Sequence, residues 1–169
     1  MRLRFSSWLF VLPFIVPTYG QQGEADYKNP DLSSTERTAD LINRMTLKEK
    51  VGQLLCPFGW EMWKKDGGEV VPSKTFQEHV ENHHIGMLWG TYRADPWTQK
   101  TLENGLDPKL AAKTGNVLQR YVMENTRLGI PMFLAEEAPH GHMAIGTTVF
   151  PTGIGLASTW ATETIEEVG

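Results

Sequence analysis

The sequence predicts an α/β fold in which helices cover a parallel sheet. Two observations support this class. Helix-like and strand-like segments alternate along the chain, and the strand-like segments 85–90 and 130–135 are apolar throughout, without polar–apolar alternation. Strands that are buried on both faces have this pattern, and they occur in parallel sheets with helices on both sides.

The first twenty residues predict a secretory signal peptide. Arg2 and Arg4 precede an apolar run over residues 8–17, and a cleavage site is expected before Gln21. The run is shorter than the about 20 residues that a membrane span requires. Since no cysteine lies near the cut, no lipid anchor is expected. We therefore predict export to the periplasm or the medium.

Charge and cysteine content exclude several classes of protein. The chain has 169 residues and a formal charge of −4, and cleavage before Gln21 changes the charge to −6, because residues 1–20 contain two arginines and no acid. No basic stripe for nucleic acid remains. Cys56 is the single cysteine, which excludes an internal disulfide. Its apolar neighbours predict a buried, unreactive thiol.

Two short helices are expected after a polar leader over residues 21–32. Residues 33–36 (SSTE) and 46–49 (TLKE) both fit the capping box, in which the first and last side chains bond each other's backbone amides. Apolar residues follow each box at helical spacing: Leu41, Ile42 and Met45 after the first, and Val51, Leu54 and Leu55, on one face, after the second.

Residues 59–72 are interpreted as an exposed loop. Trp60 and Trp63 lie in it, together with lysines, Asp66 and a Gly-Gly pair. Exposed indoles stack on ligands, whereas indoles at the edge of a core serve packing. The sequence leaves both alternatives open for Trp60 and Trp63.

The second half of the chain supplies the alternation. A helix is expected over 73–84, with Phe76, Val80 and His83 at helical spacing, before the strand at 85–90. Asp107 as N-cap and Pro108 at the first helical position begin the clearest helix. Gly129 is expected to end it at the C′ position, and the strand 130–135 follows. The inner face of the helix that begins at Pro108 is expected to hold Leu110, Val117, Leu118, Tyr121 and Val122.

A last helix is expected from Thr162, with Ile165 and Val168 facing inward. The sequence stops at Gly169, about two turns later. We therefore expect residues 1–169 to be the front portion of a longer protein.

Two adjacent carboxylates follow the last strand-like segment. Ligands of parallel α/β folds bind beyond the carboxyl ends of the strands, where Glu136 and Glu137 lie. A carboxylate there can bridge neighbouring hydroxyls of a sugar. Because neighbouring strand residues point in opposite directions, only one should face a ligand, while the other pairs with a cation or holds the loop. Both could also be ordinary surface acids.

Two histidines close by raise a metal alternative. Glu136, Glu137, His140 and His142 are residue types that bind zinc or iron. The segment lacks a helical H-x-x-x-H pair, and Pro139 argues against a continuous helix. For His140 the favoured interpretation is a structural histidine that bonds the loop backbone.

Three segments resemble landmarks of glycoside hydrolase family 3. They are residues 41–54 (LINRMTLKEKVGQL), residues 127–141 (RLGIPMFLAEEAPHG), and residues 148–151 (TVFP) with 153–160 (GIGLASTW). Their order and spacing also match. The resemblance covers about residues 36 to 169.

The resemblance implies a secreted, exo-acting, retaining β-glycosidase that hydrolyses terminal non-reducing β-D-glucosyl or xylosyl residues from oligosaccharides. It implies no metal and no cofactor. Residues 33–169 would be the N-terminal part of a (β/α)8 TIM-barrel-like domain, incomplete in this chain, because a full barrel takes about 250 residues. The run Ala138-Pro139-His140-Gly141 resembles the glucosidase and xylosidase branch more than the hexosaminidases, in which Gly-Gly follows the acid.

The resemblance assigns one substrate-binding residue. Glu137 stands where the family places an acid, often Asp, that binds hydroxyls of the terminal sugar in the −1 subsite. Glu is longer than Asp, so the hydroxyl that it contacts, and with it the sugar preference, stays open. Glu136 would face away, and His140 would shape the loop near the site.

No catalytic residue is assigned in residues 1–169. The family's downstream arginine, its Lys-His pair and its nucleophilic Asp lie beyond the third landmark. Glu136 and Glu137 do not form a retaining pair, because such carboxyls stand about 5 Å apart on opposite sides of the sugar. The segment alone is expected to be inactive. Two alternatives stay open: a sugar-binding module that uses Glu137 with Trp60, Trp63 or Trp89, and a metal-dependent hydrolase.

Overall fold

The computed structural model describes residues 26–168, so the predicted signal peptide and its cleavage site before Gln21 lie outside the described residues. The chain divides into two compact units, Met1–Asn43 and Arg44–Gly169. Within residues 26–168, no helix combines the length and the hydropathy that a membrane crossing requires.

The first unit contains a 3-10 turn, η1 (Asp26–Lys28), and most of helix α1 (Ser34–Arg44). The expected capping box is present, since the Ser33 amide donates to Glu36 and the Glu36 amide donates to Ser33 Oγ. The leader also bonds the helix: the Tyr27 amide donates to Asp40 at 3.0 Å, and Arg37 Nε donates to the Tyr27 carbonyl at 2.9 Å.

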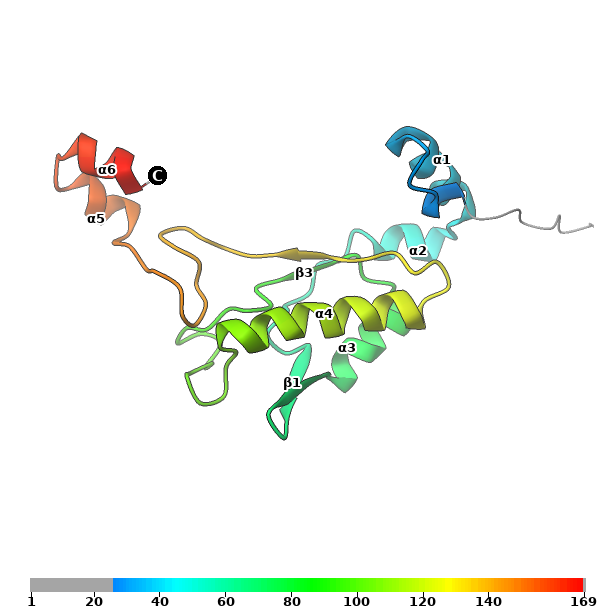
Figure 1. The fold of residues 1–169 in the computed structure, drawn as a ribbon, viewed down its shortest axis with the longest axis horizontal. Coiled ribbons are helices and arrows are strands. Elements are labelled where there is room, and N and C mark those ends of the chain that lie inside the picture. The colour runs from blue at the N-terminus through cyan, green and yellow to red at the C-terminus, as the bar shows by residue number, and fades with distance from the viewer. Residues whose placement is uncertain (1–25, 169) are drawn as a thin grey trace, which may run out of the picture. The chain divides into compact units, whose positions relative to one another are not determined.

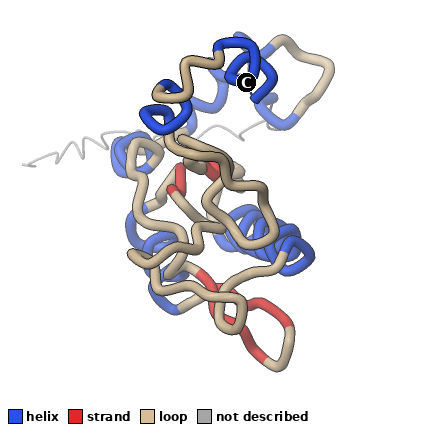
Figure 2. The backbone as a smooth tube through the Cα atoms, turned by 90° about the vertical axis from the view of Figure 1, so that its left-hand side faces the viewer, coloured by secondary structure: helices blue, strands red, loops and turns tan. Residues whose placement is uncertain are grey.

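The second unit is a mixed α/β structure that holds both small sheets (Figures 1 and 2). Its elements are α2 (Leu47–Gly52), β1 (Trp63–Asp66), β2 (Glu69–Pro72), α3 (Lys74–Glu78), the π-helical turn η2 (His79–His83), β3 (Met87–Trp89), α4 (Pro108–Asn125), β4 (Phe133–Ala135), α5 (Gly153–Ala157) and α6 (Thr162–Val168).

The predicted parallel pairing is confirmed. β3 and β4 pair in parallel, with Leu88 opposite Leu134. The segment before β1 extends this arrangement, because Phe58 forms a parallel bridge with Trp89 and the Gly59 amide donates to the Trp89 carbonyl at 2.7 Å. Three parallel segments therefore lie side by side in chain order, with α4 crossing between β3 and β4.

The core lies between these strands and the helices. Phe76 of α3, Leu88 of β3 and Leu118 of α4 are fully buried in one cluster. Asp107 caps α4 by accepting from the Leu110 amide, with Pro108 at the first helical position, as expected. The helix ends at Asn125 with Thr126 as C-cap. The prediction of Gly129 as its C′ residue is therefore wrong; Gly129 adopts a φ of +60° in the following loop.

The interpretation of residues 59–72 as a loop is wrong. β1 and β2 form an antiparallel hairpin, which projects from the rest of the unit (Figure 2). Gly67 and Gly68, with φ of +55° and +91°, form its two-residue turn. Positive φ at both central residues is the requirement of the type I′ hairpin turn, which explains the glycine pair. Trp60 and Trp63 are 6 % and 4 % exposed, so both serve packing.

Two expectations about burial also fail. Cys56 is exposed, not buried. The second capping box forms, but its helix α2 ends at Gly52, and the apolar side chains expected on one inner face are all exposed: Val51, Leu54 and Leu55.

Candidate functional site

The candidate site lies where β3 and β4 end. The Gly90 amide donates to the Ala135 carbonyl at 2.8 Å, which holds the two strand ends together. Beyond them, the loop after β3 bonds the loop after β4, since the Ala94 amide donates to the Met143 carbonyl at 2.8 Å. Carboxyl ends of parallel strands are where ligands bind in such folds.

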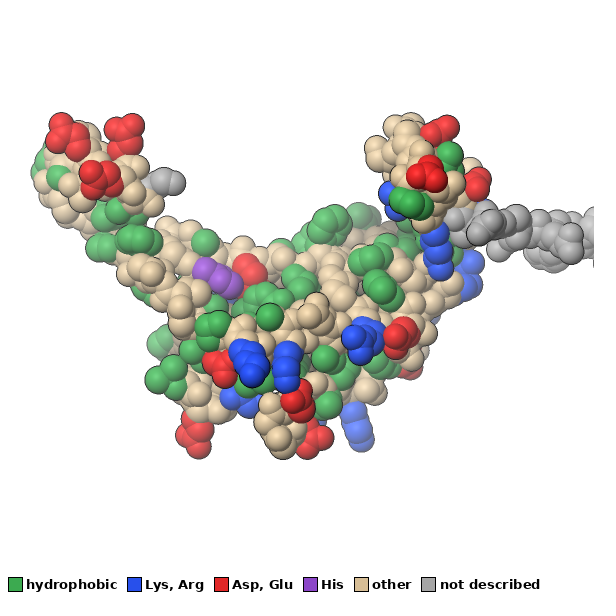
Figure 3. Space-filling view, viewed as in Figure 1, with side chains coloured by type: hydrophobic (Ala, Val, Ile, Leu, Met, Phe, Trp, Pro, Cys, Tyr) green, Lys and Arg blue, Asp and Glu red, His purple; other side chains and the backbone are tan. Residues whose placement is uncertain are grey.

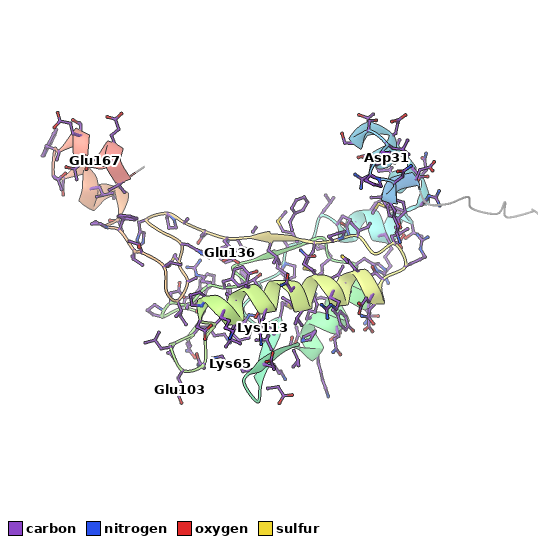
Figure 4. The ribbon with its side chains drawn as sticks, viewed as in Figure 1. Asp31, Lys65, Glu103, Lys113, Glu136 and Glu167 are labelled. Atoms are coloured by element: carbon purple, nitrogen blue, oxygen red, sulfur yellow. The ribbon has the colours of Figure 1, made fainter. Side chains whose placement is uncertain are left out.

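Glu136 connects these two loops. One carboxylate oxygen accepts from the Tyr92 amide at 3.2 Å, and the other lies 3.1 Å from His142 Nε2. The side chain is 18 % exposed and lies just beyond β4 (Figure 4). Burial, followed by the charge of Glu136, raises the pKa of the Tyr92 phenol above its ordinary value. Glu136 thus faces protein on both oxygens.

Glu137 has a different environment. Its Oε2 accepts from Arg93 Nη1 at 2.6 Å, and its side chain is 46 % exposed. Within residues 26–168, its Oε1 accepts no hydrogen bond. One carboxylate oxygen is therefore held by the protein, and the other is available to a ligand.

Arg93 is paired with acids and bordered by two indoles. Nε donates to Asp95 at 2.7 Å, and the guanidinium lies 5.1 Å from the Trp89 ring and 4.9 Å from the Trp97 ring. Burial acts to raise the pKa of Asp95, but the hydrogen bonds from Thr98 and Arg93 outweigh it and leave this pKa below its ordinary value. Both charges therefore remain paired at neutral pH.

Trp89 and Trp97 belong to an aromatic cluster of four rings: Phe58, Trp60, Trp89 and Trp97. Phe58 stacks on Trp60 with centroids 4.5 Å apart, and Trp97 meets Trp60 edge-on at 5.1 Å. Trp97 is 57 % exposed, so part of the cluster faces solvent beside the carboxylates. Figure 3 shows histidine and acidic side chains together over the segment that follows β4, next to hydrophobic ones.

His140 joins two parts of the loop after β4 through hydrogen bonds with the backbone of Phe150. Its Nδ1 lies 2.9 Å from the Phe150 carbonyl, and the Phe150 amide donates to the His140 carbonyl at 2.7 Å. Gly141 beside it has a φ of +100°, and a Cβ there would lie 2.1 Å from the Thr148 carbonyl oxygen. This loop therefore requires glycine at 141.

The structure separates the residues of the metal alternative. Glu137 pairs with Arg93, Glu136 with His142, and His140 with backbone. No group of three or more histidine, cysteine, aspartate or glutamate side chains within residues 26–168 could hold a metal ion.

Of the indoles considered for ligand binding, Trp63 is fixed by protein contacts. Its Nε1 donates to the Thr91 carbonyl at 3.0 Å, and Lys100 covers its ring. Arg93, Asp95 and Trp97 were not singled out from the sequence. The run Arg93-Ala94-Asp95-Pro96-Trp97 begins just after a strand-like segment, and the strand-end argument that selected Glu137 would have found it.

Comparison with known proteins shows the family to which the chain belongs. Residues 46–169 match the model of the glycosyl hydrolase family 3 N-terminal domain. The chain belongs to glycosyl hydrolase family 3. This confirms the family resemblance of the three landmark segments.

Three proteins with glycosidase names are similar to the chain. It is 30 % identical to a presumed β-xylosidase of Formosa agariphila, over 89 % of this chain and 18 % of that protein. It is 28 % identical to a periplasmic β-glucosidase of Salmonella typhimurium, over 77 % of this chain and 13 % of that protein. A solved β-glucosidase structure from Erythrobacter marinus matches with a TM-score of 0.59 and 28 % identity, over 87 % of this chain and 17 % of that one. The chain spans less than a fifth of these relatives.

Proposed function

We propose that the protein containing this chain is a glycoside hydrolase that removes terminal, non-reducing β-D-glucosyl or β-D-xylosyl residues from oligosaccharides with retention of configuration. The names of the family relatives, β-glucosidase and β-xylosidase, support this class of substrate. Within this proposal, residues 33–169 contribute to a (β/α)8 domain. The three parallel segments in chain order support that architecture.

The observation that carries the proposal is the environment of Glu137. It is a half-exposed carboxylate at a strand end, with one oxygen held by Arg93 and the other without a bond from residues 26–168. A carboxylate in this setting accepts charge-assisted hydrogen bonds from sugar hydroxyls. Glu137 is therefore proposed as the residue that binds the terminal sugar in the −1 subsite.

Glu136 and His140 are proposed to shape the site without contacting the reacting bond. Their contacts support this role, because Glu136 joins the loops after β3 and β4, and His140 closes the second loop. The mechanism assigned to these residues is binding and orientation. Bond cleavage needs two carboxyls on opposite sides of the sugar, a geometry that adjacent Glu136 and Glu137 do not provide.

The protein is further proposed to be exported, with cleavage before Gln21. The periplasmic location in the name of the Salmonella relative supports export. N-terminal sequencing of the mature protein, recovered from cell fractions and medium, tests both points. A retained Met1 in cytoplasmic material would contradict them.

The decisive experiment uses the complete product of the gene. Aryl β-D-glucoside and β-D-xyloside hydrolysis is measured for the wild type and Glu137→Ala, with product anomers followed by proton NMR. Loss of hydrogen bonds to a charged group costs about 1.5–3 kcal/mol, so kcat/KM should fall about 10- to 100-fold. Glu69→Gln is the matched control, since the Glu69 side chain forms an exposed pair with Lys113. Hydrolysis unaffected by Glu137→Ala would refute the assignment, and absence of hydrolysis would refute the function.

A further inference from the structure

A single guanidinium next to the proposed sugar-binding carboxylate is bonded to two acids and bordered by two indoles. In its plane, Arg93 Nε donates to Asp95 and Nη1 donates to Glu137. The rings of Trp89 and Trp97 lie 5.1 and 4.9 Å from the guanidinium carbon, and their centroids are 5.8 Å apart, so both indoles border the guanidinium from neighbouring directions. The Arg93 side chain is only 11 % exposed, against 46 % for Glu137. The fixed partner of this pair is therefore the arginine.

Asp95 is itself anchored, which prevents the guanidinium from rotating. The Thr98 amide donates to Asp95 Oδ1 at 2.9 Å, and the Asp95 amide donates to Thr98 Oγ1 at 3.1 Å. Thr98 is 8 % exposed. The direction of Nη1 is therefore set by a turn that does not contain Glu137.

An exposed glutamate has several rotatable bonds and samples many rotamers, so a ligand that uses it must order it first. The bond from Nη1 to Oε2 restricts this freedom and leaves Oε1 without a hydrogen bond from residues 26–168. Arginine suits this task better than lysine, because its planar fork donates in fixed directions and stacks on aromatic faces.

We propose that Arg93 is a positioning residue that fixes the carboxylate of Glu137 for binding the terminal sugar. The proposal rests on the glycosidase function proposed above. Arg93 acts through Glu137, so its contribution to turnover depends on Glu137 being present. A purely structural arginine would contribute equally whether or not Glu137 is present. This difference separates the two roles.

The test is a double-mutant cycle in the complete gene product. Arg93→Met, Glu137→Ala and the double variant are assayed on an aryl β-glucoside, with kcat and KM determined separately. Arg93→Met should lower kcat/KM about 10-fold or more in the wild type, mainly through KM, and less than about 3-fold in the Glu137→Ala background. Arg93→Lys should restore part of the loss. Lys113→Met, which breaks the exposed pair with Glu69, is the control and should leave activity unchanged.

Each outcome decides a separate point. Equal losses from Arg93→Met in both backgrounds, with active wild type, would overturn the positioning role and leave the glycosidase function standing. A wild type without activity on β-glycosides would overturn both. Thermal melts and circular dichroism show whether Arg93→Met folds. If it does not, the same cycle with Arg93→Lys gives the result, because lysine keeps the charge and loses the planar fork.

Discussion

An ion pair between distant parts of the second unit makes its stability depend on pH. Arg127 donates to both oxygens of Glu49, at 3.1 and 2.7 Å, and also to the Arg44 carbonyl at 2.8 Å. Glu49 simultaneously completes the capping box with Thr46 at the start of α2. The residues after α4 are thereby tied to the start of α2.

The pKa of Glu49 gives the size of this effect. The hydrogen bond from Arg127 is the largest cause that lowers this pKa, to about 2; burial opposes it, and the Thr46 hydrogen bonds and the charge of Arg127 add to it. A shift from 4.5 to about 2 would correspond to about 3 kcal/mol at neutral pH. Arg127 is 49 % exposed, and screening by solvent reduces this to about 1–2 kcal/mol.

The sign follows from linkage. Because the folded-state pKa lies below the unfolded value, the contribution is fully present above about pH 5 and is lost as the pH falls towards 2. Glu49→Gln removes the charge and keeps a residue that completes a capping box. We expect this variant to be about 1–2 kcal/mol less stable than wild type at pH 7, with more than half of the difference gone at pH 3.

Urea unfolding at pH 7 and pH 3, followed by circular dichroism, measures this difference. The control is Glu69→Gln, because Glu69 and Lys113 are 67 % and 42 % exposed and such pairs contribute little. A destabilisation of Glu49→Gln that is equally large at both pH values would refute the electrostatic account.

Three further outcomes are expected in the same protein. Gly141→Ala should lower kcat/KM and destabilise by about 1–3 kcal/mol, because its Cβ would overlap the Thr148 carbonyl; enzyme kinetics and thermal melts check this. Thr91→Val should stabilise by about 1 kcal/mol in urea, because Thr91 Oγ1 is buried without a hydrogen-bond partner within residues 26–168; a loss of stability would contradict this. Leu118→Ala should cost about 2–5 kcal/mol in the same assay, since Leu118 is fully buried, and a cost below about 1 kcal/mol would refute its place in the core.

Local signals in the sequence predicted local structure well. Both capping boxes, the Asp107-Pro108 start of α4 and the two apolar strands appear as expected, because each depends on residues close together in the chain. The hairpin β1–β2 was missed although Gly67-Gly68 is a known signal for it. The lysines beside it favoured a loop, whereas both are exposed residues of β1.

Burial and side-chain pairing were harder to predict. Val51, Leu54 and Leu55 have the spacing of a buried face, yet burial depends on what packs against that face, and they are exposed. For the site, the strand-end argument selects Glu137 and, applied to the strand before it, also Arg93, but it does not predict that the two side chains pair. Arg93 reaches Glu137 across 44 positions of sequence, through a register that only the paired strands define.

The two sheets also differ in when they can form. The hairpin closes over a two-residue turn, so its strands meet early and at small entropic cost. β3 and β4 are separated by the whole of α4 and its flanking loops, and their pairing must wait until this long crossover is compacted. Arg93 and Glu137 follow these two strands, so the proposed sugar site is among the last parts of the unit to assemble. Pulse-labelled hydrogen exchange would show this order as late protection of the Gly90 amide relative to the hairpin amides.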